Sequence, residues 1–335
     1  MNFGIAIHAG YPPDQLIQIV QRAERLGFTQ VWVADEGLYR DPYATLTLAA
    51  LSTSHIQLGI GVTNPYTRHP ALTAAAVATV DELSRGRMVL GLGAGGSGPL
   101  ALGFGKPRPI DAMRDAASIV NALTTTGRVD YAGGYYRFRG KLDFESPRRV
   151  PIFIGTRGPR MLALAGELAD GVILGSLGRP EIIHHAIRHI DTGARRAGRE
   201  AGSLPLVSWL PTCISSDRAL AADVVRSFVA VAVITSRSLV PDIGKTLPAS
   251  TQEFLARHGW VRSAVTVDAV KTALTQEHFE TFALVGPTEL VRARIGELAA
   301  LPLAQISVLL TPPPGSSIEE QMKAFSDGVI GRVHA

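Results

Sequence analysis

Short β-rich runs alternate with amphipathic helical runs along most of this chain, and this alternation constrains the fold more than any other feature. Strand–helix alternation implies parallel strands with the helices packed outside the sheet. Eight strand-like runs can be counted, at residues 3–7, 30–34, 56–62, 87–92, 150–154, 171–174, 206–214 and 306–310. Eight units favour a closed (β/α)8 TIM barrel over an open doubly wound sheet, and 335 residues suffice for one barrel with insertions.

The predicted helices fill the intervals between these runs. The first one shows the pattern, since Leu16, Ile19, Val20 and Ala23 share one face between prolines at the start and Gly27 at the end. The others are predicted near residues 42–53, 70–83, 111–123, 159–168, 180–197, 217–233 and 319–329. Each of them follows its strand along the chain, as a βα barrel requires.

Two segments interrupt the alternation. Near residues 127–148, Gly133 and Gly134 join two β-rich pieces, which predicts a hairpin insertion before the fifth strand. Residues 237–285 are predicted to form helices and loops inserted before the last unit. No Pro/Ser-rich linker divides the chain, so residues 1–335 are expected to form a single barrel domain.

Composition and charge exclude several classes of protein. With 46% hydrophobic and 19% charged residues the chain is too apolar to be disordered. Its net charge is only +4, and its basic residues form isolated pairs at 148–149 and 195–196, so no nucleic-acid partner is expected. The mild positive bias suits a small anionic ligand, such as one that carries phosphate.

Neither a targeting segment nor a metal site is expected from the sequence. No apolar stretch reaches the roughly 18 residues of a membrane span, and the first residues enter a strand directly, so we expect a cytoplasmic protein with no membrane partner. The single cysteine, Cys213, excludes internal disulfides and cysteine zinc clusters. His185 and His189 have metal-ligand spacing on one helix, but no carboxylate completes a known motif, so no metal is expected.

In a βα barrel the functional residues follow the C-terminal ends of the strands. The loop at residues 155–160 is the clearest of these candidates, because Gly155 and Gly158 allow close backbone approach and Pro159 opens a helix. The free N–H groups of a helix N-terminus favour an anion. Thr156 can donate to it, and Arg157 or Arg160 can pair with phosphate oxygens. An ordinary tight turn with surface arginines is the alternative.

A glycine motif follows the fourth strand. Residues 91–96 match GxGxxG and Asp111 lies 20 positions after Gly91, as in a dinucleotide-binding fingerprint. That fingerprint also needs an immediate helix, which the glycines and prolines between residues 98 and 109 prevent. The glycines are better explained by a strand end that passes close under a planar ligand.

A resemblance to a known family is carried by residues 61–70, 79–87, 91–95, 155–161, 165–171 and 282–286. These segments resemble the luciferase-like flavin superfamily. More narrowly, they resemble the branch that contains the deazaflavin-dependent methylenetetrahydromethanopterin reductases. The resemblance extends from about residue 3 to 330 and implies a luciferase-like (β/α)8 barrel with insertions, commonly dimeric, with a flavin or deazaflavin ring at the barrel mouth.

The resemblance also implies which residues bind the cofactor. A non-proline cis peptide would join Gly61 to Val62 behind the ring. The cofactor would be lined by Thr63, Asn64, Gly93, Ala94, Gly95 and Gly96. Its phosphate would be held by Gly155, Thr156, Arg157, Gly158 and Ser176.

The sequence departs from the family at the positions expected to act on substrate. The reductases and related enzymes place Asp-His after the second strand, where this chain has Asp35-Glu36. The reductases have a glutamate within the first strand, where this chain has Ala6, and related sugar dehydrogenases have one after the fourth strand, where it has Ser97 and glycines. The cofactor scaffold is therefore better supported than the substrate or the proton donor.

We therefore expect an oxidoreductase that transfers hydride between reduced coenzyme F420 and a small organic molecule, with a methylene-tetrahydropterin or folate-like compound as the candidate substrate. Glu36 is the expected proton-handling residue, with His8, which follows the first strand, as the next candidate. Glu36 could instead point to solvent or pair with Arg40. The alternatives for the whole protein are an FMN-dependent monooxygenase and a non-catalytic or flavin-free member of the family.

Overall fold

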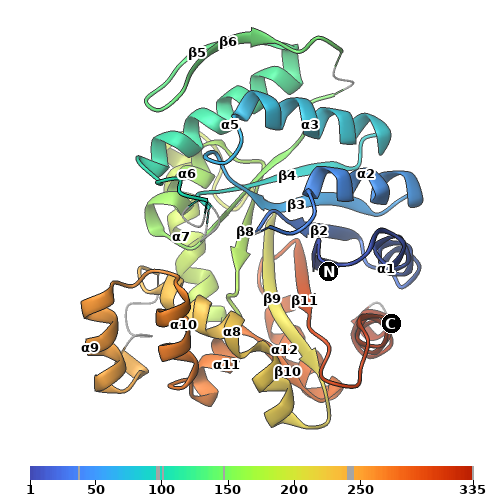
Figure 1. The fold of residues 1–335 in the computed structure, drawn as a ribbon, viewed down its shortest axis with the longest axis vertical. Helices are drawn as coiled ribbons and strands as arrows, with labels where there is room; N and C mark the ends of the chain where they lie inside the picture. Colours follow the sequence, from blue (N-terminus) through green and yellow to red (C-terminus); the bar gives the residue numbers. More distant parts are fainter. Residues whose placement is uncertain (37, 96–98, 100–101, 146–147, 240–244, 334–335) are drawn as a thin grey trace.

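Eight parallel strands close into a barrel in this computed structural model, which describes all residues except 37, 96–98, 100–101, 146–147, 240–244 and 334–335 (Figure 1). The strands are β1 (Asn2–His8), β2 (Gln30–Ala34), β3 (Gln57–Thr63), β4 (Met88–Gly93), β7 (Ile152–Thr156), β8 (Gly171–Gly175), β9 (Leu206–Ile214) and β11 (Gln305–Leu310). They pair in the order β9-β11-β1-β2-β3-β4-β7-β8, and β8 pairs with β9 to close the barrel. The predicted (β/α)8 fold is confirmed.

Strand register is regular except between β3 and β4. Val172 aligns with Leu206 where β8 meets β9, and Asn2 aligns with Gln305 where β1 meets β11. Between β3 and β4 the register shifts between Ile60 and Thr63. The peptide bond from Gly61 to Val62 is cis, as the family resemblance implied.

Two apolar cores lie on opposite sides of the strands. A small inner cluster fills the barrel, and it consists of Ala6, Trp32, Val89, Ile173 and Val207. A much larger outer cluster lies between the strands and the surrounding helices. Successive strand residues point to opposite faces, so in β1 Ala6 belongs to the inner core while its neighbours belong to the outer one.

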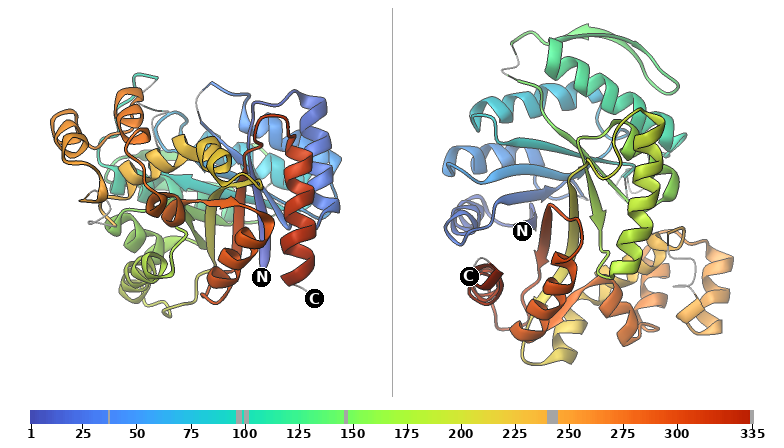
Figure 2. Two further views of the ribbon diagram at one scale, coloured as in Figure 1. Left: turned by 90° about the horizontal axis from the view of Figure 1, so that it is seen from below. Right: turned by 180° about the vertical axis from the view of Figure 1, so that it is seen from behind.

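The surrounding helices mostly begin at a proline, whose fixed φ suits the first helical turn. They are α1 (Pro13–Arg25), α2 (Pro42–Ser52), α3 (Pro70–Leu83), α5 (Pro109–Thr126), α6 (Pro159–Leu168), α7 (Pro180–Arg196), α8 (Arg218–Ser236), α12 (Thr288–Ala299) and α13 (Ile318–Phe325). A π-helical turn (Ser326–Ile330) and α14 (Gly331–Val333) follow α13. Figure 2 shows α13 beside α1, so the two ends of the chain close the outer ring together.

Both interruptions of the alternation project from the barrel (Figure 1). The first is an antiparallel hairpin of β5 (Arg128–Ala132) and β6 (Arg137–Lys141), which lies beside α5. The second contains α9 (Ala249–His258), α10 (Ala264–Lys271) and α11 (Gln276–Phe282). It ends in β10 (Leu284–Gly286), which pairs with the end of β9.

Two elements were missed by the sequence analysis. Strand β10 has only three residues, too few to show an alternating pattern. Helix α12 is rich in charged residues and buries only Val291, Ile295 and Leu298, so its apolar stripe is narrow. The expectation that no apolar stretch could span a membrane also needs correction.

Helix α8 has 19 residues and a mean hydropathy of 1.7, which is long and apolar enough for a membrane span by length and composition. Its buried residues include Val225, Val229 and Val233, which belong to the outer core of the barrel. Packing against β9, α10 and α11 therefore accounts for the apolar character of α8.

Candidate active site at the barrel mouth

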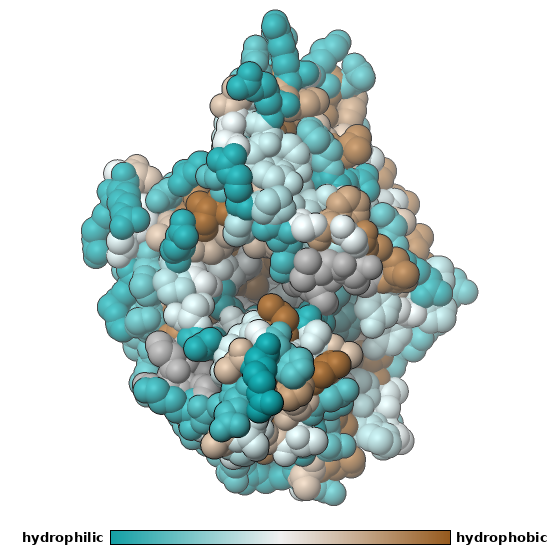
Figure 3. Space-filling view, turned by 60° about the vertical axis from the view of Figure 1, so that its left-hand side comes forward, coloured by the Kyte–Doolittle hydropathy of each residue, from teal (hydrophilic) through white to brown (hydrophobic). Residues whose placement is uncertain are grey.

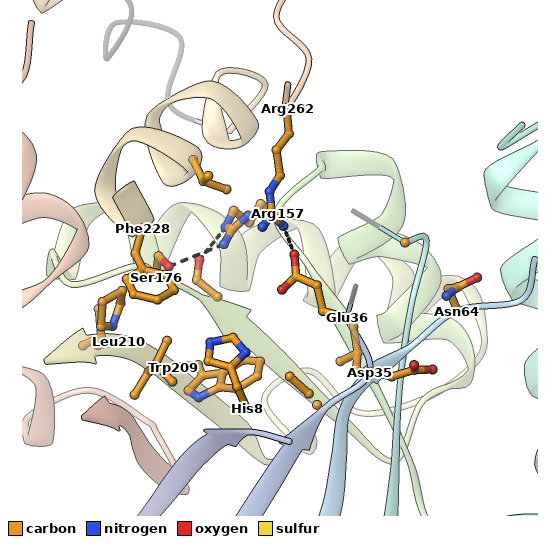
Figure 4. A pocket seen from close by; sticks show the side chains of 18 of the residues that line it. His8, Asp35, Glu36, Asn64, Arg157, Ser176, Trp209, Leu210, Phe228 and Arg262 are labelled. Carbon is orange, nitrogen blue, oxygen red and sulfur yellow. Dashed lines mark hydrogen bonds and ion pairs between the residues drawn. The ribbon is translucent and has the colours of Figure 1, made fainter. Parts of the chain in front are cut away.

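A cavity of about 250 Å³ lies at the C-terminal ends of the barrel strands. The space-filling view shows a hollowed face with apolar residues inside the hollow (Figure 3). Eight of the predicted site residues line the cavity: His8, Glu36, Gly61, Val62, Asn64, Gly95, Arg157 and Ser176. They come from β1, β2, β3, β4, β7 and β8 or from the loops that follow them, as a site at the barrel mouth requires (Figure 4).

Three glycines on neighbouring strands make room for the side chain of Val62. A Cβ on Gly93 would lie 2.6 Å from Val62 Cγ2, and a Cβ on Gly155 would lie 2.8 Å from Cγ1. A Cβ on Gly91 would lie 3.1 Å from Cγ1 and 2.0 Å from the carbonyl oxygen of Ile60. Gly91 and Gly93, the first two glycines of the GxGxxG match, therefore serve close packing of β4 against β3 behind the cavity.

Glu36 forms an ion pair with Arg262 across the mouth of the cavity, and Figure 4 shows the two side chains facing one another. Both are about one-third exposed, at 32% and 34%. Arg262 lies between α9 and α10, so this pair connects the helical insertion to the end of β2. The pairing with Arg40 that the sequence left open does not occur, because Arg40 donates to the carbonyl oxygen of Gly10 at 2.8 Å.

Asp35 and Asn64 are both engaged by their own surroundings. Thr63 donates to the Asp35 carboxylate at 2.6 Å, which ties the end of β2 to β3, while burial raises the pKa of Asp35. The Asn64 side-chain oxygen accepts from the backbone N–H groups of Tyr66 and Thr67 at 2.9 and 3.0 Å. The amide of Asn64 therefore shapes the turn after β3 and has little capacity left for a ligand.

Arg157 is bonded inward, which was not expected. Its Nε donates to the carbonyl oxygen of Gly175 at 2.6 Å, and Nη1 donates to Thr235 Oγ1 on α8 at 2.7 Å. Only Nη2 remains near the cavity, 3.5 Å from Ser176 Oγ. Burial, assisted by the charge of Arg262, lowers the pKa of Arg157 to about 10. Arg157 therefore braces β7 against β8 and α8, and a bidentate grip on phosphate would require it to give up these bonds.

The loop before α6 presents an open helix start. Gly158 is the N-cap residue, and no side chain caps the first N–H groups of the helix. A Cβ at Gly158 would meet nothing within 4 Å, so the space around this backbone is free. Thr156 accepts from the N–H of Gly158 at 3.2 Å and fixes the turn. Backbone N–H groups at such a helix start suit a phosphate.

An aromatic wall stands on the opposite side of the cavity, formed by His8, Trp209 and Phe228 (Figure 4). The His8 and Phe228 rings are stacked, with centroids 6.1 Å apart and planes at 16°. His8 Nδ1 and Trp209 Nε1 are buried atoms without a hydrogen-bond partner. Burial lowers the pKa of His8, and Arg262 lowers it further, while Glu36 acts in the opposite direction. Two unpaired polar atoms in a cavity wall are the feature expected of a ligand site.

The remaining predicted residues do not line the cavity. Gly93 and Gly155 lie behind Val62, Thr63 is fully buried, and Ala94, Thr156 and Gly158 lie nearby in the loops. Gly96 lies outside the described residues. Position 6, where the reductases carry a glutamate, is a buried alanine in the inner core, so no acid stands there.

Sequence reasoning missed Trp209, Phe228 and Arg262. Trp209 could have been found, because β9 was predicted and alternation from the inward Val207 places Trp209 inside the mouth. Phe228 lies on the cavity side of a helix that is apolar on most faces, and Arg262 lies in an insertion without periodicity. Neither residue carried a local signal.

Residues 1–305 match the family model described as luciferase-like monooxygenase. The chain belongs to this family. It is 35% identical to a 5,10-methylenetetrahydromethanopterin reductase of Archaeoglobus fulgidus over 99% of this chain and 100% of that one. It is 31% identical to the reductase of the same name from Methanolobus tindarius, again over 99% and 100%. The luciferase-like resemblance drawn from the motifs is confirmed.

A solved structure supports the same placement within the luciferase-like family. The coenzyme F420 dependent tetrahydromethanopterin reductase of Methanopyrus kandleri superimposes with a TM-score of 0.82 and 27% identity, covering 99% of each chain. Homologues of this chain are therefore F420-dependent oxidoreductases that act on small molecules. Among the described residues, no group of three or more His, Cys, Asp or Glu side chains is arranged to hold a metal ion.

Proposed function

We propose that this protein is an F420-dependent oxidoreductase that transfers hydride to the bridging carbon of a 5,10-methylene-tetrahydropterin, of the folate or methanopterin type. The observation that carries the proposal is the match to reductases named for the methanopterin form of that substrate, which covers 99% of this chain and 100% of each relative. The cavity at the barrel mouth fits this chemistry because it joins an apolar wall to a few polar groups.

The reaction requires balanced delivery of one hydride and one proton. The bridging carbon gains a hydride, its bond to N10 breaks, and N10 takes up a proton, so the product is a 5-methyl-tetrahydropterin. Bound F420 in its reduced form would supply the hydride, since its ring carries hydride at a carbon atom. The protein supplies the position of the two partners, a dry cavity and control of the proton.

The residues present fit a planar ring with a phosphate-bearing tail. Val62 offers an apolar surface that three glycines keep free of other side chains. The open start of α6 and the hydroxyl of Ser176, which is 9% exposed, would hold the phosphate. In this arrangement Arg157 contributes positive potential and keeps the loops in place, and it need not contact the phosphate itself.

Glu36 remains our proposal for the residue that handles the proton. It reaches the cavity and lies near His8, whose pKa it influences. Its carboxylate is paired with Arg262, so Glu36 would hand on a proton only after Arg262 has moved away from it. His8, with an unpaired buried Nδ1, is the alternative proton-handling group.

A binding titration against F420, FMN and NADPH tests the cofactor assignment. F420 should bind at least ten times more tightly than the other two. A preference for FMN would replace the proposal with a flavin-dependent monooxygenase, and a preference for NADPH would indicate a flavin-free member.

We also propose that the chain forms one domain and assembles as a homodimer in the cytoplasm, with no nucleic-acid or membrane partner. Support for a protein contact comes from Leu51 and Leu72, which are 67% and 58% exposed on the neighbouring helices α2 and α3. Sedimentation of the wild type and of Leu72→Glu tests it, and a monomeric wild type would exclude the dimer.

A further inference from the structure

A second cavity, of about 400 Å³, adjoins the first on the side of β1 and β11. The two cavities share four lining residues, Ile7, His8, Phe228 and Leu309. Shared lining means that the same side chains face both spaces. The second cavity is therefore continuous with the active-site wall rather than a separate surface feature.

The partition between the cavities is made of side chains. His8 extends from the end of β1 and Phe228 from α8, and their rings stack at 6.1 Å. The exposed ring of Tyr39 also lies near His8, with ring centroids 5.5 Å apart. Rotation of one or two side chains would therefore join the spaces, with no change in the backbone of the barrel.

The lining of the second cavity selects for a neutral, flat group. It is built from residues 10–12 and Gln15 on the β1–α1 side and from residues 310–312 and Ile318 on the β11–α13 side. None of these carries a formal charge, and the polar groups are a phenol, an amide and a hydroxyl. Burial raises the pKa of Tyr11 and the negative charge of Glu319 raises it further, so an anionic group placed beside Tyr11 would be repelled.

We infer that the second cavity holds the aryl group attached to N10 of the substrate, while the pterin lies in the first cavity together with the cofactor ring. This inference rests on the proposed function. In a 5,10-methylene-tetrahydropterin the reacting carbon bridges N5 and N10, so the pterin and the aryl ring extend from it in different directions. An enzyme that acts on this carbon needs space on both sides of it. The His8–Phe228 partition lies at the junction of two such spaces.

The test compares two probes that differ by the aminobenzoylglutamate arm, whose aryl ring is attached to N10. Tetrahydrofolate and 6-methyltetrahydropterin are titrated against the F420-loaded enzyme, wild type and Thr311→Phe. Thr311 lines the second cavity and not the first, so the larger ring projects into the second cavity and narrows it. The wild type should bind tetrahydrofolate about tenfold more tightly, because burial of an aryl ring contributes that much or more. Thr311→Phe should remove this advantage and leave the affinities for 6-methyltetrahydropterin and F420 within about twofold.

Two further variants make the result decisive. Gln15→Phe fills the same space from α1 and should reproduce the effect if Thr311→Phe fails to fold. Ala219→Phe adds the same ring to an unrelated groove beside α11 and should change nothing. An unchanged preference for tetrahydrofolate in both filling variants would overturn the inference and leave the proposed function intact. A wild type that binds F420 but neither probe would overturn it as well, whereas failure to bind F420 would remove the proposed function itself.

Discussion

Replacing Gly93 with alanine tests whether the glycines of β4 exist to make room for Val62. The added Cβ would lie 2.6 Å from Val62 Cγ2 and 3.3 Å from the carbonyl oxygen of Gly155. Ordinary contact begins near 3.4 Å, so Val62 has to move by about 0.8 Å. Gly91 and Gly155 stand close to Cγ1 of Val62, so the side chain is expected to move toward the cavity that it lines.

The displaced side chain would then occupy part of the cofactor site. Overpacking of this kind costs about 1–3 kcal/mol, which corresponds to a loss of affinity of about 5- to 150-fold. In the free protein Val62 can relax into the empty cavity, so the free energy of unfolding should fall by less than about 1 kcal/mol. Gly93→Ala should therefore weaken F420 binding far more than it weakens the fold.

Fluorescence titration with F420 and urea unfolding of the same samples measure the two effects. The double variant Gly93→Ala/Val62→Ala removes both methyl groups involved and should recover most of the affinity. Gly296→Ala is the matched control, because a Cβ there meets nothing within 4 Å in α12, and it should leave binding unchanged. Wild-type affinity in Gly93→Ala, or no recovery in the double variant, would refute the packing argument.

Three other predictions follow from the side-chain contacts. Arg157→Met should lower the free energy of unfolding by about 0.5–1.5 kcal/mol, since it removes the hydrogen bonds to the half-buried carbonyl of Gly175 and to the exposed hydroxyl of Thr235; a loss of F420 affinity with no loss of stability would instead restore the phosphate contact. Glu36→Gln should lower turnover by about 10²–10⁴-fold with F420 affinity little changed, and full turnover would leave His8 as the candidate. Because burial lowers the pKa of His8 in the folded state, the unfolded chain binds protons more readily, so wild-type stability should fall as the pH drops below 6.5. His8→Gln should reduce that fall in urea titrations at pH 7.5 and 5.5, and an identical pH dependence would contradict it.

The strands and helices of this fold could be predicted from the sequence because each carries its own hydrophobic pattern and the βα unit recurs along the chain. Strand β2 and the hairpin of β5 and β6 carry their own patterns of β-rich runs and turn glycines. Strand β10 could not be predicted, because three residues become a strand only when the end of β9 offers hydrogen bonds.

Site residues could be predicted only where they come directly after the end of a predicted strand. Glu36 was placed correctly at the mouth, but its partner Arg262 comes from a distant insertion, and no local pattern brings the two together. For Arg157 the local sequence was misleading, because it predicts a side chain that is free to bind phosphate. Its guanidinium instead satisfies Gly175 and Thr235, a choice set by tertiary packing.

Isotope transfer tests the central claim most directly. Reduced F420 labelled with deuterium at its hydride-carrying carbon would be incubated with the enzyme and 5,10-methylene-tetrahydrofolate, and the product examined by mass spectrometry and NMR. The account predicts one deuterium in the methyl group of 5-methyl-tetrahydrofolate, with oxidised F420 formed in equal amount. A methyl product that carries no deuterium, or oxidation of F420 without any methyl product, would contradict it.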